Sequence, residues 1–215
     1  MRVWINLGAL FLVLSLPAQA IRENWLCEDS PFDQYPDAYY TCEAMQSFKH
    51  GFDTHALEHL KRASKWGSKT AQYRVGLMIL GGIGTEADPI EGAAWLLLAN
   101  ERNNSDISAR LREVQDKMST EDWEVAHQRA LVLKEEYGDF AALERRTRWV
   151  RRMKNRMTGS RLGKPMATVR VADSQGITVD QMTNRLDVYE RSLRHMVTTV
   201  EYRDFRVIEP KTEGR

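Results

Sequence analysis

Three histidines and a glutamate gathered in one short stretch are the first candidates for chemistry. His55 and His59 are four positions apart, Glu58 lies between them, and His50 precedes them. On a helix such spacing places both imidazoles on one face, where they could hold a metal ion. Two ligands fall short of a usual zinc set, however. The alternative is that His59 packs against the next helix and His55 lies at the surface, so we expect no metal site.

A glycine-rich run and the absence of local catalytic motifs decide whether phosphate binding or catalysis is expected. Glycine-rich turns ahead of helices can cradle phosphates, but the run Gly81–Gly84 lacks the preceding strand and the lysine of a phosphate loop. The sequence contains no G-x-S-x-G, H-E-x-x-H or C-x-x-C motif. Catalytic groups can also converge from distant positions. With no constellation in view, we expect no catalytic residues and no cofactor.

The N-terminal end is typical of an exported protein. Residues 1–20 combine Arg2, an apolar run from Leu7 to Leu16, and the small-x-small triplet that ends at Ala20. The run is too short for a comfortable permanent span, which takes about 20 residues. We therefore expect a cleaved signal peptide and a periplasmic or secreted protein; a retained anchor is the alternative.

The two cysteines follow in the mature N-terminal part. Cys27 and Cys42 form an even pair, which in an oxidising compartment indicates a disulfide. This bond would tie an irregular leader, residues 21–36, onto the first helix. Closing a loop of about 15 residues is worth about 3 kcal/mol in the chain-entropy model.

From Asp37 onward the pattern is helical, which predicts a mainly α fold. The expected helix starts are Asp37, Asp53 or Thr54, Ser68, Asp88-Pro89, Ser105 or Asp106, and the serine and threonine at 119–120. Gly51, Gly67, Gly81–Gly84 and Gly138 separate these helices. Two helix pairs recur at a period near 35 residues, as in stacked helical repeats.

The small residues of these pairs resemble the Sel1-like repeat family over residues 38–101. The match consists of Ala56, Ala63, Ser64, Gly67, Ala71, Val75, Gly76, Gly82, Gly84, Asp88, Ala93, Trp95 and Ala99. Departures from the family pattern are His59, Ile79, Gly92 and Asn100. The resemblance implies a short α-solenoid, with residues 37–138 forming the repeats and a helical cap, and it implies scaffolding or adaptor work.

Charge divides the chain into two parts. Residues 21–138 hold 13 Lys and Arg against 20 Asp and Glu, whereas residues 139–215 hold 17 against 10. A basic helix is predicted over 139–157, with an apolar stripe and a charged face. That face consists of Arg145, Arg146, Arg148, Arg151, Arg152, Lys154 and Arg156. It could bind an anionic membrane surface or an acidic protein, or it could dock on the acidic half of the same chain.

The C-terminal part is interpreted as a linker and a small appendage. The composition of residues 158–165 is typical of a linker. Within 166–215, strand-like alternation covers 166–171, a helix is expected from Asp180, and strand-forming residues return from Met196 to Ile208. A small α+β region is therefore predicted.

Aromatic side chains on the helical stack are the candidates for holding a partner. A concave helical surface commonly binds peptides through exposed aromatics, here Tyr40, Tyr73, Trp95 and Trp123. We expect a non-enzymatic scaffold that binds an unidentified envelope protein or peptide, with no nucleic acid and no small-molecule substrate. The alternatives are an envelope enzyme acting on peptidoglycan or β-lactam-type substrates, and a membrane-surface protein using the basic helix.

Overall fold

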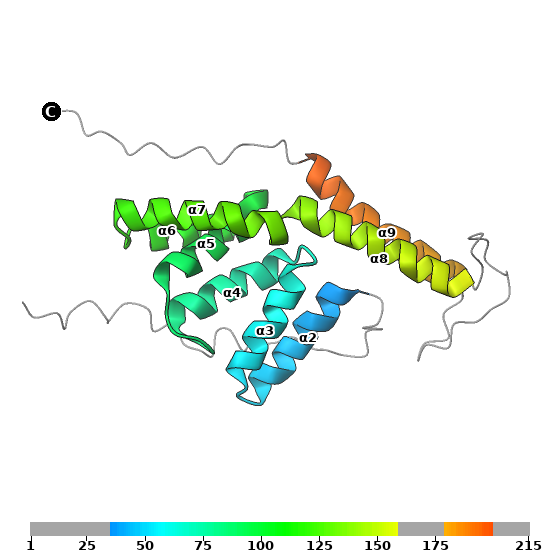
Figure 1. Cartoon of the computed structure of the whole chain (residues 1–215), viewed down its shortest axis with the longest axis horizontal. Helices are drawn as coiled ribbons and strands as arrows, with labels where there is room; N and C mark the ends of the chain where they lie inside the picture. Colours follow the sequence, from blue (N-terminus) through cyan, green and yellow to red (C-terminus); the bar gives the residue numbers. More distant parts are fainter. Residues whose placement is uncertain (1–34, 159–178, 200–215) are drawn as a thin grey trace, which may run out of the picture.

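The computed structural model describes residues 35–158 and 179–199, which are mainly helical and contain no strand (Figure 1). The α-helices are α2 (Pro36–Lys49), α3 (Asp53–Ser64), α4 (Lys69–Gly81), α5 (Pro89–Ala99), α6 (Ser105–Gln115), α7 (Thr120–Tyr137), α8 (Asp139–Thr158) and α9 (Val179–Thr199). A short 3-10 helix, η2 (Asn100–Arg102), follows α5. None of these helices is long and apolar enough to span a membrane.

Side-chain caps fix three of the helix starts where the sequence predicted them. Ser68 Oγ accepts a hydrogen bond from the backbone N–H of Ala71 at the start of α4. Asp88 Oδ1 does the same for Glu91 at the start of α5. Ser119 Oγ accepts from Asp122 at the start of α7. Each bond satisfies an N–H that the first helical turn would otherwise leave unpaired.

Two other predicted caps are corrected, whereas the predicted start of α6 at Ser105 is confirmed. Tyr35, not Asp37, is the N-cap of α2, because Pro36 takes the first helical position. Phe52 is the N-cap of α3, without a side-chain bond. Asn104 caps α6 through hydrogen bonds from the two N–H groups that follow Ser105. In the first case the Asp37 carboxylate is engaged elsewhere in the molecule, as described below.

Helices α2 to α5 pack one on the next in chain order, and α5 then contacts both α6 and α7. Their buried apolar side chains form one core, which includes Phe48, Leu60, Met78 and Leu96. The predicted glycine turns are confirmed: Gly51, Gly67, Gly82 and Gly84 all have positive φ. Gly84 also lies so close to the backbone of Asp53 that a Cβ would fall 2.5 Å from its carbonyl oxygen.

Two glycines allow α4 and α5 to approach one another closely. A Cβ built on Gly76 would lie 3.0 Å from the carbonyl oxygen of Gly92, and a Cβ on Gly92 would lie 3.0 Å from that of Gly76. Leu80 and Leu96 close over the same contact. The interface is therefore formed by backbone against backbone, which only residues without a side chain permit.

Helices α8 and α9 form an antiparallel pair that projects from the rest of the molecule (Figure 1). Val150, Leu186 and Tyr189 make its core, with Trp149 and Met153 packed against them. The expected helix from Asp180 is confirmed, but α9 continues to Thr199. The strand predicted from Met196 is therefore wrong for residues 196–199, where the helix that carries Leu186 and Tyr189 simply continues.

Several predictions fall outside the described residues. They are the signal peptide at 1–20, most of the leader at 21–36, the linker beyond Thr158, and the strands at 166–171 and 200–208. Cys27 is also outside, so its disulfide with Cys42 stays a prediction.

Candidate functional site

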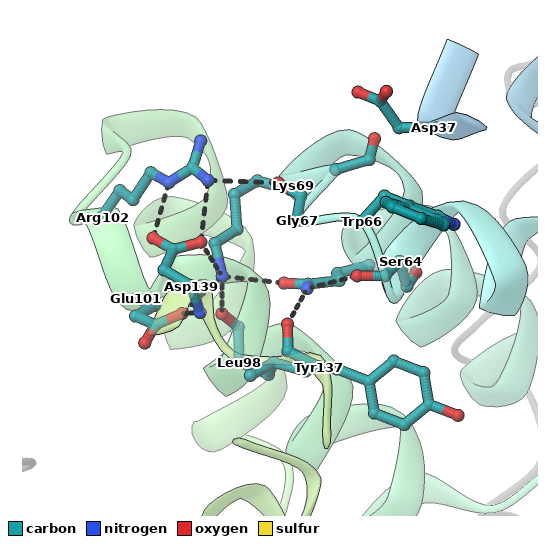
Figure 2. A network of polar contacts seen from close by, with 12 residues as sticks. Asp37, Ser64, Trp66, Gly67, Lys69, Leu98, Glu101, Arg102, Tyr137 and Asp139 are labelled. Carbon is teal, nitrogen blue, oxygen red and sulfur yellow. Dashed lines mark hydrogen bonds and ion pairs between the residues drawn. The ribbon is translucent and has the colours of Figure 1, made fainter. Parts of the chain in front are cut away.

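A polar network lies at the junction of α4, η2, α7 and α8, and Lys69 is at its centre (Figure 2). Lys69 is the first residue of α4, so its side chain leaves the helix next to η2 and the start of α8. Its Nζ lies 2.6 Å from Glu101 Oε2 and 3.2 Å from Asp139 Oδ1. The Leu98 carbonyl and Gln72 Oε1 accept hydrogen bonds from the same Nζ.

Arg102 completes the ion pairs of this junction network. Its Nε and one terminal nitrogen donate to the two Asp139 oxygens at 2.8 and 2.7 Å, a bidentate pair. The same guanidinium donates to the Gly67 carbonyl at 3.1 Å. Glu101 in turn accepts from the backbone N–H of Asp139 at 3.1 Å. The acidic start of α8 is thus held by side chains from α4 and η2.

Gln72 links the network to the core. It is fully buried on α4, and its Nε2 donates to the carbonyls of Ser64 and Tyr137 at 3.3 and 2.8 Å. These carbonyls belong to the last residues of α3 and α7, and the Ser64 carbonyl also accepts from the backbone N–H of Gly67 at 3.0 Å. One amide therefore serves two helix ends.

Electrostatics keep Asp139 ionised despite its burial. Burial alone raises the pKa of a carboxyl group, but the hydrogen bonds from Arg102 and the charges of Lys69 and Arg102 outweigh it. The pKa of Asp139 is consequently lowered. Its chemical capacity is already taken up by two cations, so the junction network holds elements together rather than offering a free base.

A second polar group, the Asp37 cluster, joins α2 to the α8–α9 arm and consists of Asp37, Arg146 and Tyr189. Arg146 donates to Asp37 Oδ2 at 3.1 Å and to the Trp66 carbonyl at 2.7 Å. Tyr189 OH donates to Asp37 Oδ1 at 2.7 Å, and the Arg146 guanidinium lies over the Tyr189 ring, 4.2 Å from its centre. Burial and the Asp37 charge raise the pKa of Tyr189.

These contacts show that some residues of the basic face predicted on α8 are engaged within the molecule, whereas others are exposed. Arg146 is only 5% exposed, so it lies inside the molecule and cannot contact an anionic surface. Arg145 donates to the carbonyls of Lys65 and Glu136, and Lys154 pairs with Asp187 of α9. The alternative of docking on the acidic half of the chain therefore holds for Arg146, whose partner is Asp37.

Among the α8 side chains that the structure describes, residues 139–155, three basic residues are exposed. Arg148, Arg151 and Arg152 are all exposed. Their spacing of three and four positions places them on one side of the helix. Arg148 has Glu144 at 3.9 Å, an exposed pair one turn away. This trio is named the arginine ridge.

The four aromatic residues predicted to bind a partner differ in exposure. Trp95 is 2% exposed; its Nε1 donates to Glu91 Oε1 at 3.0 Å and its ring meets Tyr137 edge-on. Trp95 is therefore a core residue and not a surface anchor. Tyr40, Tyr73 and Trp123 are half-buried, each packed against the core with part of its surface in solvent. No two of them contact each other among the described ring pairs.

The histidine cluster does not converge on a single point. His59 stacks on Tyr40 of α2, the preceding helix, with ring centres 6.4 Å apart. His55 is exposed and lies beside Phe52. Burial lowers the pKa of His59. Within residues 35–158 and 179–199, no three His, Cys, Asp or Glu side chains are grouped so that they could hold a metal ion.

Sequence reasoning missed the junction network and could not name Asp37 as the partner of Arg146, because the paired residues are far apart in the chain. Arg146 and Asp37 are separated by 109 positions, and Arg102 and Asp139 by 37. One signal was present: Gln72 stands on the side of α4 that also carries other fully buried residues, where an apolar residue is expected. A polar residue in such a stripe indicates a buried hydrogen-bonding role.

Comparison with known proteins finds no matching family model, curated protein or solved structure.

Proposed function

We propose that this protein is an exported interaction scaffold in which α2–α7 form a short stack of Sel1-like helix pairs. The observation that carries the proposal is the order of packing: α2 contacts α3, α3 contacts α4, and α4 contacts α5. Stacked helical repeats are held together by such neighbour contacts and use the surface they create for binding. The resemblance of residues 38–101 to the Sel1-like family agrees with this packing.

Rigidity supports the same proposal. The junction network and the Asp37 cluster fasten the α8–α9 arm to the stack through largely buried, charge-assisted hydrogen bonds. Breaking such a buried pair is costly, so it fixes geometry more firmly than an exposed pair does. A rigid composite surface loses little conformational entropy when a partner docks on it.

Half-exposed aromatics on the stack would anchor the partner, which we propose to be a protein or peptide of the cell envelope. Tyr73 of α4 and Trp123 of α7 each present part of a large ring to solvent while the rest packs on the core. Aromatic side chains held in this way are common anchors in interfaces. Trp95 is left out of this set because it is buried.

Site-specific photo-crosslinking in the producing cells tests the proposal. A photoreactive phenylalanine analogue is placed at Tyr73 or at Trp123 in the full chain, and at exposed Val132 of α7 as the control. We expect one adduct of defined mass at Tyr73 or Trp123 and none at Val132. The same adduct pattern at all three positions, or no adduct at any, would contradict a specific scaffold.

A further inference from the structure

The arginines of the ridge form no buried ion pair within the described part of the protein. Arg145, Arg146 and Lys154 of the same helix are taken up in contacts within the molecule. Within the described part of the chain, no carboxylate lies within ion-pair distance of Arg151 or Arg152. Arg148 has only Glu144, and both side chains of that pair are 57% exposed. Such an exposed pair contributes little and leaves Arg148 available.

The side of α8 opposite the arginine ridge bears on whether this helix can insert into a membrane. Val150, Trp149 and Met153 pack against Leu186 and Tyr189 of α9. The middle of the apolar stripe, which would enter a membrane in a surface-lying amphipathic helix, is therefore covered, and only Phe140 at the start of α8 is largely exposed among the described apolar side chains of this helix. Without insertion, attachment to anionic lipid relies on basic clusters of about four to eight residues, more than this ridge supplies.

The guanidinium groups of the ridge are suited to bind carboxylates that another protein holds in fixed positions. The guanidinium group presents its N–H donors in a planar fork that matches a carboxylate with two parallel hydrogen bonds. Three such forks on adjacent turns of a helix form a row whose spacing is fixed by the backbone. Acidic side chains on another helix or strand can meet that row in register.

We propose that the arginine ridge docks an acidic segment of a partner protein. This inference rests on the proposed scaffold function and names the chemistry of one of its partners. The ridge lies on the arm, whereas Tyr73 and Trp123 lie on α4 and α7. The two surfaces are therefore separable by mutation.

The test uses the full chain and a fluorescent polyglutamate peptide about as long as α8, with binding followed by fluorescence anisotropy. The ridge variant is R148Q/R151Q/R152Q. The matched control, R185Q/R191Q/R194Q, removes the same charge from exposed positions of α9. We expect the ridge variant to weaken binding at least about tenfold and the control to change it less than about threefold, with unchanged thermal unfolding of both.

If both variants weaken peptide binding equally, the inference is overturned, because binding would then depend on net charge and not on the ridge. Undetectable binding of the unaltered chain would overturn it as well. Vesicles containing phosphatidylserine form the second arm: stronger binding to them than to the peptide, lost in the ridge variant, would assign the ridge to a membrane and not to a protein. If photo-crosslinking at Tyr73 persists while the ridge test fails, the scaffold proposal stands and only the ridge inference falls.

Discussion

At the scale of single residues, the molecule depends on a few positions where no other side chain fits. Gly76 and Gly92 illustrate this, because each leaves room for the other's carbonyl group. In an exposed helix, a glycine makes the helix less stable than an alanine does, by about 1 kcal/mol. Here the close approach of α4 and α5 reverses that preference.

Gly76→Ala should therefore destabilise the protein. The new Cβ would lie 2.8 Å from Leu96 Cδ2 and 3.0 Å from the Gly92 carbonyl oxygen, so the helices must separate. We expect a loss of about 1–3 kcal/mol in the free energy of unfolding, measured by urea denaturation. Gly81→Ala is the control, since its Cβ would meet only Ile83 at 3.5 Å. Equal stability of the two variants would contradict close packing at Gly76.

Asp139→Asn tests the junction network at its buried carboxylate. Removing the charge leaves Lys69 and Arg102 without their shared partner, and we expect a loss of about 3 kcal/mol at neutral pH. Asp116→Asn, at an exposed position, should change stability by less than about 0.5 kcal/mol. Chemical denaturation of the three proteins provides the measurement.

The same variant has a characteristic pH dependence. The pKa of Asp139 is lowered in the folded protein, so its contribution is present above the unfolded-state pKa of about 3.9 and is lost as pH falls through the folded value. The stability difference between the unaltered protein and Asp139→Asn should be constant near neutrality and shrink in acid below about pH 4. A difference that grew on acidification would show that Asp139 is not the group stabilised by Lys69 and Arg102.

At the scale of elements, the sequence predicted where helices begin and end far better than it predicted which of their side chains are buried. Ser68, Asp88 and Ser119 could be predicted as caps because capping is a local matter of a few residues. The burial of Trp95 could not, since it depends on Tyr137 and the packing of α5 against α7. Strand propensity misled at 196–199, where the helix α9 continues to Thr199.

The attachment of α8 to α2 should appear as energetic coupling between Asp37 and Arg146. In a double-mutant cycle of Asp37→Asn and Arg146→Gln, we expect a coupling of about 1–3 kcal/mol, because the pair is nearly enclosed. The control cycle of Glu144→Gln and Arg148→Gln, on the same helix but exposed, should give less than about 0.5 kcal/mol. Similar couplings in both cycles would mean that burial adds nothing to the first pair.

At the scale of the whole molecule, the sequence predicts a processed and oxidised chain. Intact-mass analysis of the protein recovered from its own cells should give a chain that begins at Ile21 and lacks two hydrogens, as one Cys27–Cys42 disulfide requires. Reduction should then lower the free energy of unfolding by about 3 kcal/mol. A chain that retains Met1, or that reacts with thiol reagents at both cysteines without reduction, would refute export or the disulfide respectively.

The connection between α7 and α8 has a mechanical consequence. Gly138 alone separates the end of α7 from the start of α8, and the arm beyond it contains a helix of 20 residues. A rod of that length measures about 30 Å, so a tilt of about 10° at Gly138 would carry its far tip through about 5 Å. The junction network and the Asp37 cluster hold the base of this arm, so loosening of either set of contacts would be magnified into a larger displacement at the tip.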